Sequence, residues 1–178
     1  MPNYIIKALE RLKHPAPFKP RHAPHRWVRK IFGQKVHLAP TEDTSEVLSP
    51  QATQHIQRVV GTFLYYIRAI DNTIQTAVNE IAVTQAAPTE ETKDANIMLM
   101  DYLHTHPKAK IRYNASGMQL YIDSDAAYLV APKAKSRVAG YFYLSDKYVK
   151  NSEQPTPTLN GTIHIECKLL NHVVSLAA

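Results

Sequence analysis

The chain has 178 residues, of which 44% are hydrophobic and 20% are charged, the composition of a soluble globular protein with one domain or two small ones. No apolar run approaches the ~20 residues that span a membrane, and no signal peptide is visible, so we expect an intracellular protein of the cytoplasm or nucleus. The single cysteine, Cys167, excludes an internal disulfide framework and fits a reducing compartment.

The net charge of +6 is concentrated near the start of the chain. Residues 1–40 carry nine lysines and arginines against one acidic residue, Glu10, which gives a net charge of +8, and the remaining residues sum to −2. A basic arm on a neutral body is typical of proteins that bind polyanions, most often nucleic acid. The same charge pattern also fits a solubilising linker.

The first predicted helix covers residues 3–13, "NYIIKALERLK", where apolar residues recur at helical spacing. Residues 14–30 then hold four prolines and no regular period, which predicts an extended segment. Histidines in this segment invite a zinc site, but without cysteine or acidic partners at fixed spacing we expect exposed linker histidines. They are His14, His22 and His25, and the residues expected to anchor the segment are Trp27, Val28 and Ile31.

Three further helices are predicted before Pro107. Ser49 is the expected cap of the first, with Pro50 at the first helical position, and Asp71 is the expected cap of the second. Thr89 is the expected cap of the third, which ends at Pro107. The residues expected to face inward are Ile5, Leu9 and Leu12 in the N-terminal helix, then Ile56, Val60, Phe63, Leu64 and Ile67, then Ile74, Ala77, Val78 and Ile81, and last Ile97, Met100 and Leu103.

After Pro107 the hydrophobic period changes from helical spacing to alternation. "MQLYIDSD", "RVAGYFYL" and "GTIHIECKLL" each alternate apolar and polar residues and are separated by loops. Such runs predict three strands in an antiparallel meander. The fold class expected from the residues is therefore α+β, with helices first and a three-stranded antiparallel sheet after them.

The order of the motifs resembles one protein family. The run "VVGTFLYYIRAIDNTIQTAVNEIAVTQAAPTEETKDANIMLMDYL" resembles the segment between the polymerase and the RNase H domain of copia-type retrotransposon polyproteins. That family shows a "VGxLxY" helix, a short second helix, and a "P-T" step into a helix that ends in "YL". The matching residues are Val60, Gly61, Leu64 and Tyr65, then Pro88 and Thr89, then Tyr102 and Leu103.

The flanking segments extend the resemblance. Upstream, "MPNYIIKALERL" resembles the family helix "Y-I-x-x-x-L-x-R-F" that follows the polymerase active site. Downstream, "DSDAAYLVAPKAKSRVAGYFYL" resembles the family's first RNase H strands, "YSDADWAGD…RSTSGYxFxL". The resemblance is weaker over residues 14–48, and two departures indicate a divergent branch. They are Asp71, Asn72 and Thr73 in place of "R-P-D", and Ala127 and Tyr128 in place of "D-W".

This resemblance implies a domain organisation. Residues 1–48 would be a basic N-terminal helix and proline-rich arm from the end of the polymerase region. Residues 49–107 would be a helical thumb and connection segment, and residues 108–178 a partial, incomplete RNase H-like domain. A three-stranded part of that fold would expose apolar surface and leave the edge of its third strand unpaired.

The resemblance also implies a catalytic residue. RNase H cleaves the RNA of an RNA–DNA hybrid with two Mg²⁺ ions, which need several carboxylate ligands. Asp125, within "SDA", matches the first of these acids as a catalytic and metal-binding residue, whereas Asp123 does not match a family acid. The other RNase H acids would follow Ala178, and the polymerase "Y-x-D-D" pair would precede Met1. We therefore expect a section of a polyprotein that binds no Mg²⁺ and is inactive alone, although its parent is a polymerase and ribonuclease.

Two other functions stay open beside this inherited one. The chain could be a non-catalytic module that binds an RNA–DNA hybrid or DNA weakly and without sequence preference, or an inert pseudogene product. The binding module would use basic residues of the arm and of the "KAKSR" run between the first two strands. These residues are Lys19, Arg21, Arg26, Arg29 and Lys30 in the arm, and Lys133, Lys135 and Arg137 in the run.

Overall fold

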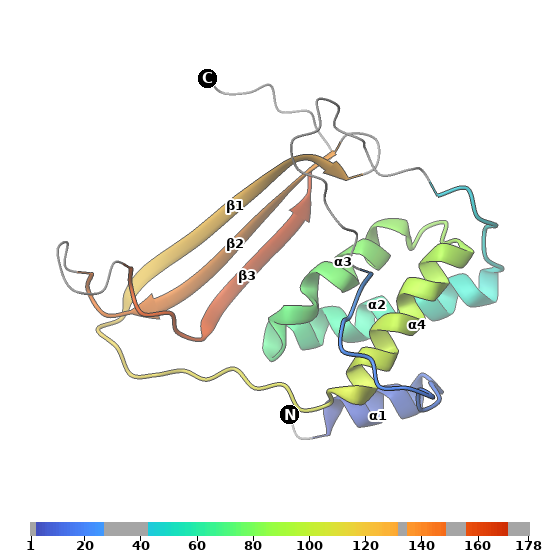
Figure 1. Ribbon diagram of the computed structural model, residues 1–178, viewed down its shortest axis with the longest axis horizontal. Helices are drawn as coiled ribbons and strands as arrows, with labels where there is room; N and C mark the ends of the chain where they lie inside the picture. The colour runs from blue at the N-terminus through green and yellow to red at the C-terminus, as the bar shows by residue number, and fades with distance from the viewer. Residues whose placement is uncertain (1–2, 27–42, 132–134, 149–155, 171–178) are drawn as a thin grey trace. The chain divides into compact units, whose positions relative to one another are not determined.

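The computed structural model describes residues 3–26, 43–131, 135–148 and 156–170. The chain forms two compact units, residues 1–110 and residues 111–178. Among the described residues, the first unit holds four α-helices and one short 3-10 helix, and the second holds a three-stranded antiparallel sheet (Figure 1). The predicted α+β class is therefore confirmed.

The first two helices form where they were predicted, although the N-terminal helix begins one residue later and ends two residues earlier than the predicted range 3–13. Helix α1 spans Tyr4–Arg11, and helix α2 spans Pro50–Ala69. The Ser49 hydroxyl accepts the Ala52 N–H at 3.4 Å and caps α2. Pro50 opens α2 because its missing N–H is a group that the first helical turn leaves unpaired in any case.

Two further helices follow after short connections. The 3-10 helix η1 spans Asn72–Ile74 and leads directly into α3, Gln75–Thr84. Asp71 starts η1 by accepting the Thr73 N–H at 3.1 Å and the Thr73 hydroxyl at 2.6 Å. Helix α4 spans Glu90–Thr105, with Thr89 as its cap, and ends just before Pro107 as predicted.

The helices of the first unit share one hydrophobic core. Helices α1, α2 and α3 all contact α4. Most of the residues predicted to face inward are buried, which confirms the helical periods of α1, α2 and α3. The buried residues of this core are Ile5, Ala8, Leu9, Leu12, Ile56, Val59, Val60, Phe63, Tyr66, Ile67, Ile74, Ala77, Val78, Ile81, Leu99, Met100 and Leu103.

The buried face of α4 differs from the predicted one. Ile97, which was expected to face inward, is 39% exposed, whereas Leu99 is fully buried. The buried stripe begins with the polar residues Thr92 and Asn96 and continues through Leu99, Met100 and Leu103 at helical spacing. Hydropathy alone does not mark the two polar members, so the apolar residues by themselves predicted a face rotated toward Ile97.

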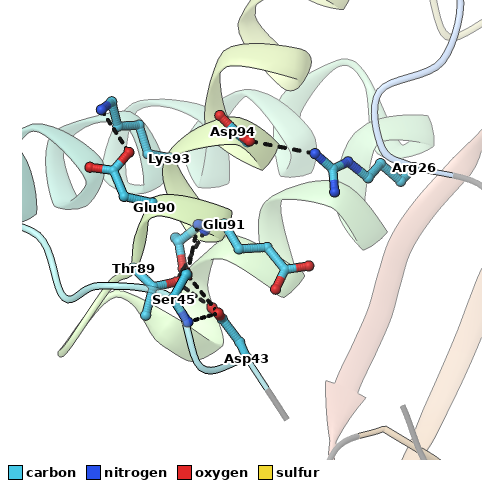
Figure 2. Close-up of polar contacts among 9 residues, drawn as sticks. Arg26, Asp43, Ser45, Thr89, Glu90, Glu91, Lys93 and Asp94 are labelled. Atoms are coloured by element: carbon cyan, nitrogen blue, oxygen red, sulfur yellow. Dashed lines mark hydrogen bonds and ion pairs between the residues drawn. The ribbon is translucent and has the colours of Figure 1, made fainter. Parts of the chain in front are cut away.

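A segment before α2 caps the start of α4 (Figure 2). The Ser45 hydroxyl donates to the Asp43 carboxylate at 2.6 Å and accepts the Glu91 N–H at 3.2 Å, and the Thr89 hydroxyl also donates to Asp43. The hydrogen bonds to Asp43 lower the pKa of its carboxyl below the usual value, and the bond from the Ser45 side chain contributes most. A carboxylate beside the first turn of a helix is favoured because that end carries partial positive charge. The connector thereby closes the N-terminal end of α4.

The second unit is a meander of three strands. Strands β1 (Gln119–Ala131), β2 (Lys135–Ser145) and β3 (Thr162–Leu169) lie in the order β1-β2-β3, and both neighbouring pairs are antiparallel. This topology confirms the predicted meander. Strand β1 extends beyond the predicted run, which ended at Asp125.

Asn160 joins the chain before β1 to the end of β2. Its side-chain amide donates to the carbonyls of Asn114 at 2.9 Å and Leu144 at 2.7 Å, and its carbonyl oxygen accepts the Asn114 N–H at 2.8 Å. Beside it, a Cβ added to Gly161 would lie 2.6 Å from the carbonyl oxygen of Arg112. A side chain at Gly161 would therefore displace the segment that approaches β1.

Directly opposed residues share a face of the sheet, so the register defines its two faces. One face carries Leu120 and Ile122 of β1, and both side chains are exposed. The other face carries Asp123 and Asp125. Among the described residues, apolar surface is therefore exposed on the face that does not carry the aspartates.

The α4 register generates a stability prediction. We expect Leu99→Ala to lower the free energy of unfolding by about 2–5 kcal/mol, because it leaves a cavity in the core. Ile97→Ala, on the same helix, should cost less than about 1.5 kcal/mol because that side chain is already partly in water. Urea unfolding measures both variants. Equal losses for the two variants would show that the inward face of α4 is wrong.

Candidate functional site

Asp125 lies on β1, opposite Ala139 of β2, and Ala139 in turn lies opposite Cys167 of β3. The Asp125 side chain is exposed. Its carboxylate accepts the N–H of the next residue, Ala126, at 2.9 Å. The sheet therefore presents this acid to solvent from the middle of its first strand.

Asp123 lies two residues before Asp125, on the same face, opposite Tyr141. Tyr143 is buried beside them, and its ring stacks on Tyr121 at a centroid distance of 5.8 Å. Burial raises the pKa of Tyr143, and the negative charge of Asp123 raises it further. The phenol thus stays protonated at neutral pH. This face combines two carboxylates with aromatic rings.

Other carboxylates of the sheet unit are engaged locally. Glu166 of β3 lies opposite Gly140, whose partner on β1 is Ser124, so Glu166 belongs to the face away from Asp125. It contacts Lys168 at 2.9 Å and His164 at 3.1 Å. Among the described residues, no group of three or more histidine, cysteine or acidic side chains is placed to hold a metal ion.

The basic residues predicted beside β1 are partly described. Arg137 lies on the same face of the sheet as Asp125, two residues before Ala139 in β2, and its guanidinium donates to the Cys167 sulfur at 3.6 Å. Lys135 opens β2 opposite Ala131. Lys133 lies outside the described residues. Among the described residues of the "KAKSR" run, Arg137 therefore shares the face of the candidate acid.

In the arm, described basic residues contact acids on α4. Arg21 lies 3.9 Å from Asp101. Arg26 lies 3.5 Å from Asp94, as Figure 2 shows. Lys19 is exposed. Two of the arm's cations are thus used within the chain. The predicted binding residues Arg29 and Lys30, and the predicted anchors Trp27, Val28 and Ile31, lie outside the described residues.

The expectation that the arm histidines are exposed linker residues is wrong for His14. Its side chain is 6% exposed, and its Nε2 lies 2.8 Å from a carboxylate oxygen of Asp101. The arm therefore follows α4 instead of leaving the body, because Asp101 offers one oxygen to His14 and the other to Arg21. In the sequence, the signal for the contact of His14 was the acid Asp101 on the polar side of a predicted helix. The sequence alone does not identify which residue Asp101 contacts.

A cavity of about 280 Å³ lies in the helical unit, and none of the described residues that line it was predicted as a site residue. Its lining includes Lys13, His14, His55 and Asn96. Burial lowers the pKa of His55, and the nearby charges of Arg58 and His14 add to this effect. His55 is therefore neutral at pH 7. The cavity combines apolar walls with a neutral imidazole and an amide.

The contact between Asp101 and the arm generates a second prediction. We expect Asp101→Ala to lower the free energy of unfolding by about 1–3 kcal/mol, because it leaves the buried His14 ring without its partner. Asp94→Ala removes an ion pair whose side chains are 64% and 60% exposed, so its cost should stay below about 1 kcal/mol. Chemical unfolding, with tryptic cleavage after Arg21 as a local probe, tests both. Faster cleavage in Asp94→Ala than in Asp101→Ala would contradict this account.

Comparisons with protein-family models, with curated proteins and with solved structures give no match to this chain. Within the described part of the chain, no helix has the length and apolar character needed to cross a membrane. The functional assignment therefore rests on the residues of the chain and on their geometry.

Proposed function

We propose that the chain is a section of a copia-type retrotransposon polyprotein. It would comprise the helical thumb and connection region of the reverse transcriptase, followed by the first three strands of an RNase H-like domain. The observation that carries this proposal is the position of Asp125. It lies within the "SDA" motif in the middle of the first strand of an antiparallel meander, directly after a helical unit.

Several residues of the helical motifs that suggested the family lie in the core or at the start of a helix. Val60 is buried in the middle of α2, beside Gly61. The step from Pro88 to Thr89 opens α4, and Leu103 lies buried in its last turn. Among the residues that carry the resemblance, Thr89 thus caps a helix and Val60 and Leu103 pack in the core, whereas Tyr65 is 60% exposed.

In the proposed parent, this region would serve RNA-directed DNA synthesis and the cleavage of RNA–DNA hybrids. Hybrid cleavage by two Mg²⁺ ions requires several carboxylates around the ions. Asp125 would be the first, and Asp123 lies on the same face. In the resembled family the remaining acids belong to other parts of the polyprotein. We therefore propose that these 178 residues do not cleave a hybrid or bind Mg²⁺ by themselves.

This proposal predicts that the chain alone has no hybrid-cleaving activity, and the Asp125→Asn variant is the control. The purified chain, incubated with an RNA–DNA hybrid and Mg²⁺, should release no more RNA fragments than the Asp125→Asn variant. Gel analysis of labelled RNA measures the cleavage. Cleavage by the unaltered chain that disappears in Asp125→Asn, and persists in Asp146→Asn, would show instead that the site is complete.

The alternative function, a non-catalytic module that binds nucleic acid, is favoured by the basic arm and by Arg137 on the face of Asp125. The contacts of Arg21 and Arg26 with α4 reduce the charge that the arm can offer to phosphates. We propose weak binding without sequence preference, carried by the basic residues of the arm other than Arg21 and Arg26. An inert product would show no such binding.

The binding proposal predicts a salt dependence. Contacts with phosphates release counterions, so affinity for duplex, hybrid and single strand should fall steeply with salt. Neutralising Lys19, Arg29 and Lys30 with glutamine should reduce the slope of log affinity against log salt by roughly one unit for each residue that meets a phosphate. Fluorescence anisotropy at several salt concentrations measures the slope.

The matched control removes the same charge elsewhere. Arg58 and Arg68 of α2 and Lys108 after α4 are exposed and lie outside the arm, and their glutamine variants should leave most of the slope unchanged. Substitutions are preferable to deleting the arm, because Ile5 and Leu9 of α1 belong to the core. Equal effects of the two triple variants would show that net charge, and not the arm, determines binding.

A further inference from the structure

Two histidines from distant parts of the chain meet at the end of α4. Nδ1 of His22, in the arm, lies 3.1 Å from Nε2 of His106, the residue that follows the last turn of the helix. The two ring centroids are 5.2 Å apart, with the rings tilted by 60°. Both residues are exposed, so a solute can reach the facing nitrogens.

The position of His106 is determined by the end of α4. Its backbone N–H donates to the Tyr102 carbonyl at 2.8 Å, and its ring lies 4.9 Å from the Tyr102 ring, measured between centroids. Pro107 follows, and a residue before proline is disfavoured from continuing a helix. His106 accordingly leaves the helical conformation, with φ −122°.

The position of His22 is determined by its neighbour Arg21. The backbone N–H of Arg21 donates to the Thr105 hydroxyl at 3.0 Å, and that hydroxyl donates to the Asp101 carbonyl at 2.8 Å. The Arg21 guanidinium lies 3.9 Å from the Asp101 carboxylate, which offsets its positive charge beside the histidines. The arm therefore holds His22 opposite His106 through contacts that do not involve either imidazole.

We propose that His22 and His106 form a two-histidine site for a divalent transition metal ion such as Zn²⁺, Ni²⁺ or Cu²⁺. Imidazole nitrogen is a ligand that all three ions favour. Two nitrogens bound to one zinc ion at about 2.0–2.1 Å in tetrahedral geometry lie roughly 3.3–3.4 Å apart. The separation of 3.1 Å approaches this value, so a small outward shift of either ring, with a rotation that turns both nitrogen lone pairs toward the ion, admits it.

Without metal, one of the facing nitrogens carries a proton and donates it to the other. Binding the ion replaces this shared proton, and the proton moves to the outer nitrogen of the same ring or to solvent. Two histidines supply two ligands, and water or an external ligand would complete the coordination. Because the ligands come from the arm and from the end of α4, the ion would tie the arm to the helical unit.

Isothermal titration calorimetry of the full chain with ZnCl₂ tests the site. We expect His22→Ala and His106→Ala each to weaken Zn²⁺ binding at least tenfold. His104→Ala is the matched control, because His104 is exposed in the last turn of α4 and, among the described residues, faces no second histidine. The Zn²⁺ affinity of this variant should equal that of the unaltered chain. Unchanged affinity in either pair variant, or equal weakening in His104→Ala, would overturn the proposal.

A double variant distinguishes one shared ion from two separate ones. If His22 and His106 bind the same ion, the loss of either histidine removes the same binding event, so the double variant should bind no fewer Zn²⁺ ions than either single variant. A calorimetric stoichiometry that falls by one in each single variant and by two in the double variant would mean that the histidines bind separate ions. The Tm gives a second measure, since Zn²⁺ should raise it in the unaltered chain and in His104→Ala but not in the pair variants. A rise of equal size in all variants would place the ion elsewhere.

Discussion

The burial of one face of α4 is the constraint on which the helical unit depends. Helices α1, α2 and α3 all contact α4, and the stripe from Thr92 to Leu103 lies in the core that they share. The connector before α2 closes one end of this helix through Asp43, and the arm follows its polar side to the other end. The connector contacts the start of α4, and the arm contacts residues near its end. A change in the register of α4 would therefore alter the core and the arm contacts together.

The polar side of α4 also decides how much of the arm's charge is available to a partner. By sequence, the first forty residues carry a net charge of +8. In the folded chain, Arg21 and Arg26 lie against acids of α4. Exposed ion pairs are weak, and a polyanion can compete for the same cations. The arm is therefore both a part of the fold and a candidate binding surface, which fits weak binding better than a dedicated nucleic-acid site.

The sheet unit follows a different physical rule, because its order comes from backbone pairing and not from a large core. Tyr143 is buried in it, whereas Leu120 and Ile122 remain exposed on the face away from the aspartates. Exposed apolar surface of this kind is typical of a surface that another element covers. The aspartates themselves need no partner, since a carboxylate on an open strand is solvated. Asp125 therefore lies on a face whose carboxylates are open to solvent, whereas the exposed apolar side chains of β1 lie on the other face.

The sequence by itself determined the helices, their caps and the meander, because these depend on local signals: Ser49 and Thr89 at helix starts, Pro107 at a helix end, and alternation in the strands. The inward face of α4 was not predictable from hydropathy, since Thr92 and Asn96 become buried only against other helices. The contacts of His14 with Asp101 and of His22 with His106 join residues more than eighty positions apart. Only the tertiary structure decided them, because no local pattern specifies which distant side chain an exposed polar residue will meet.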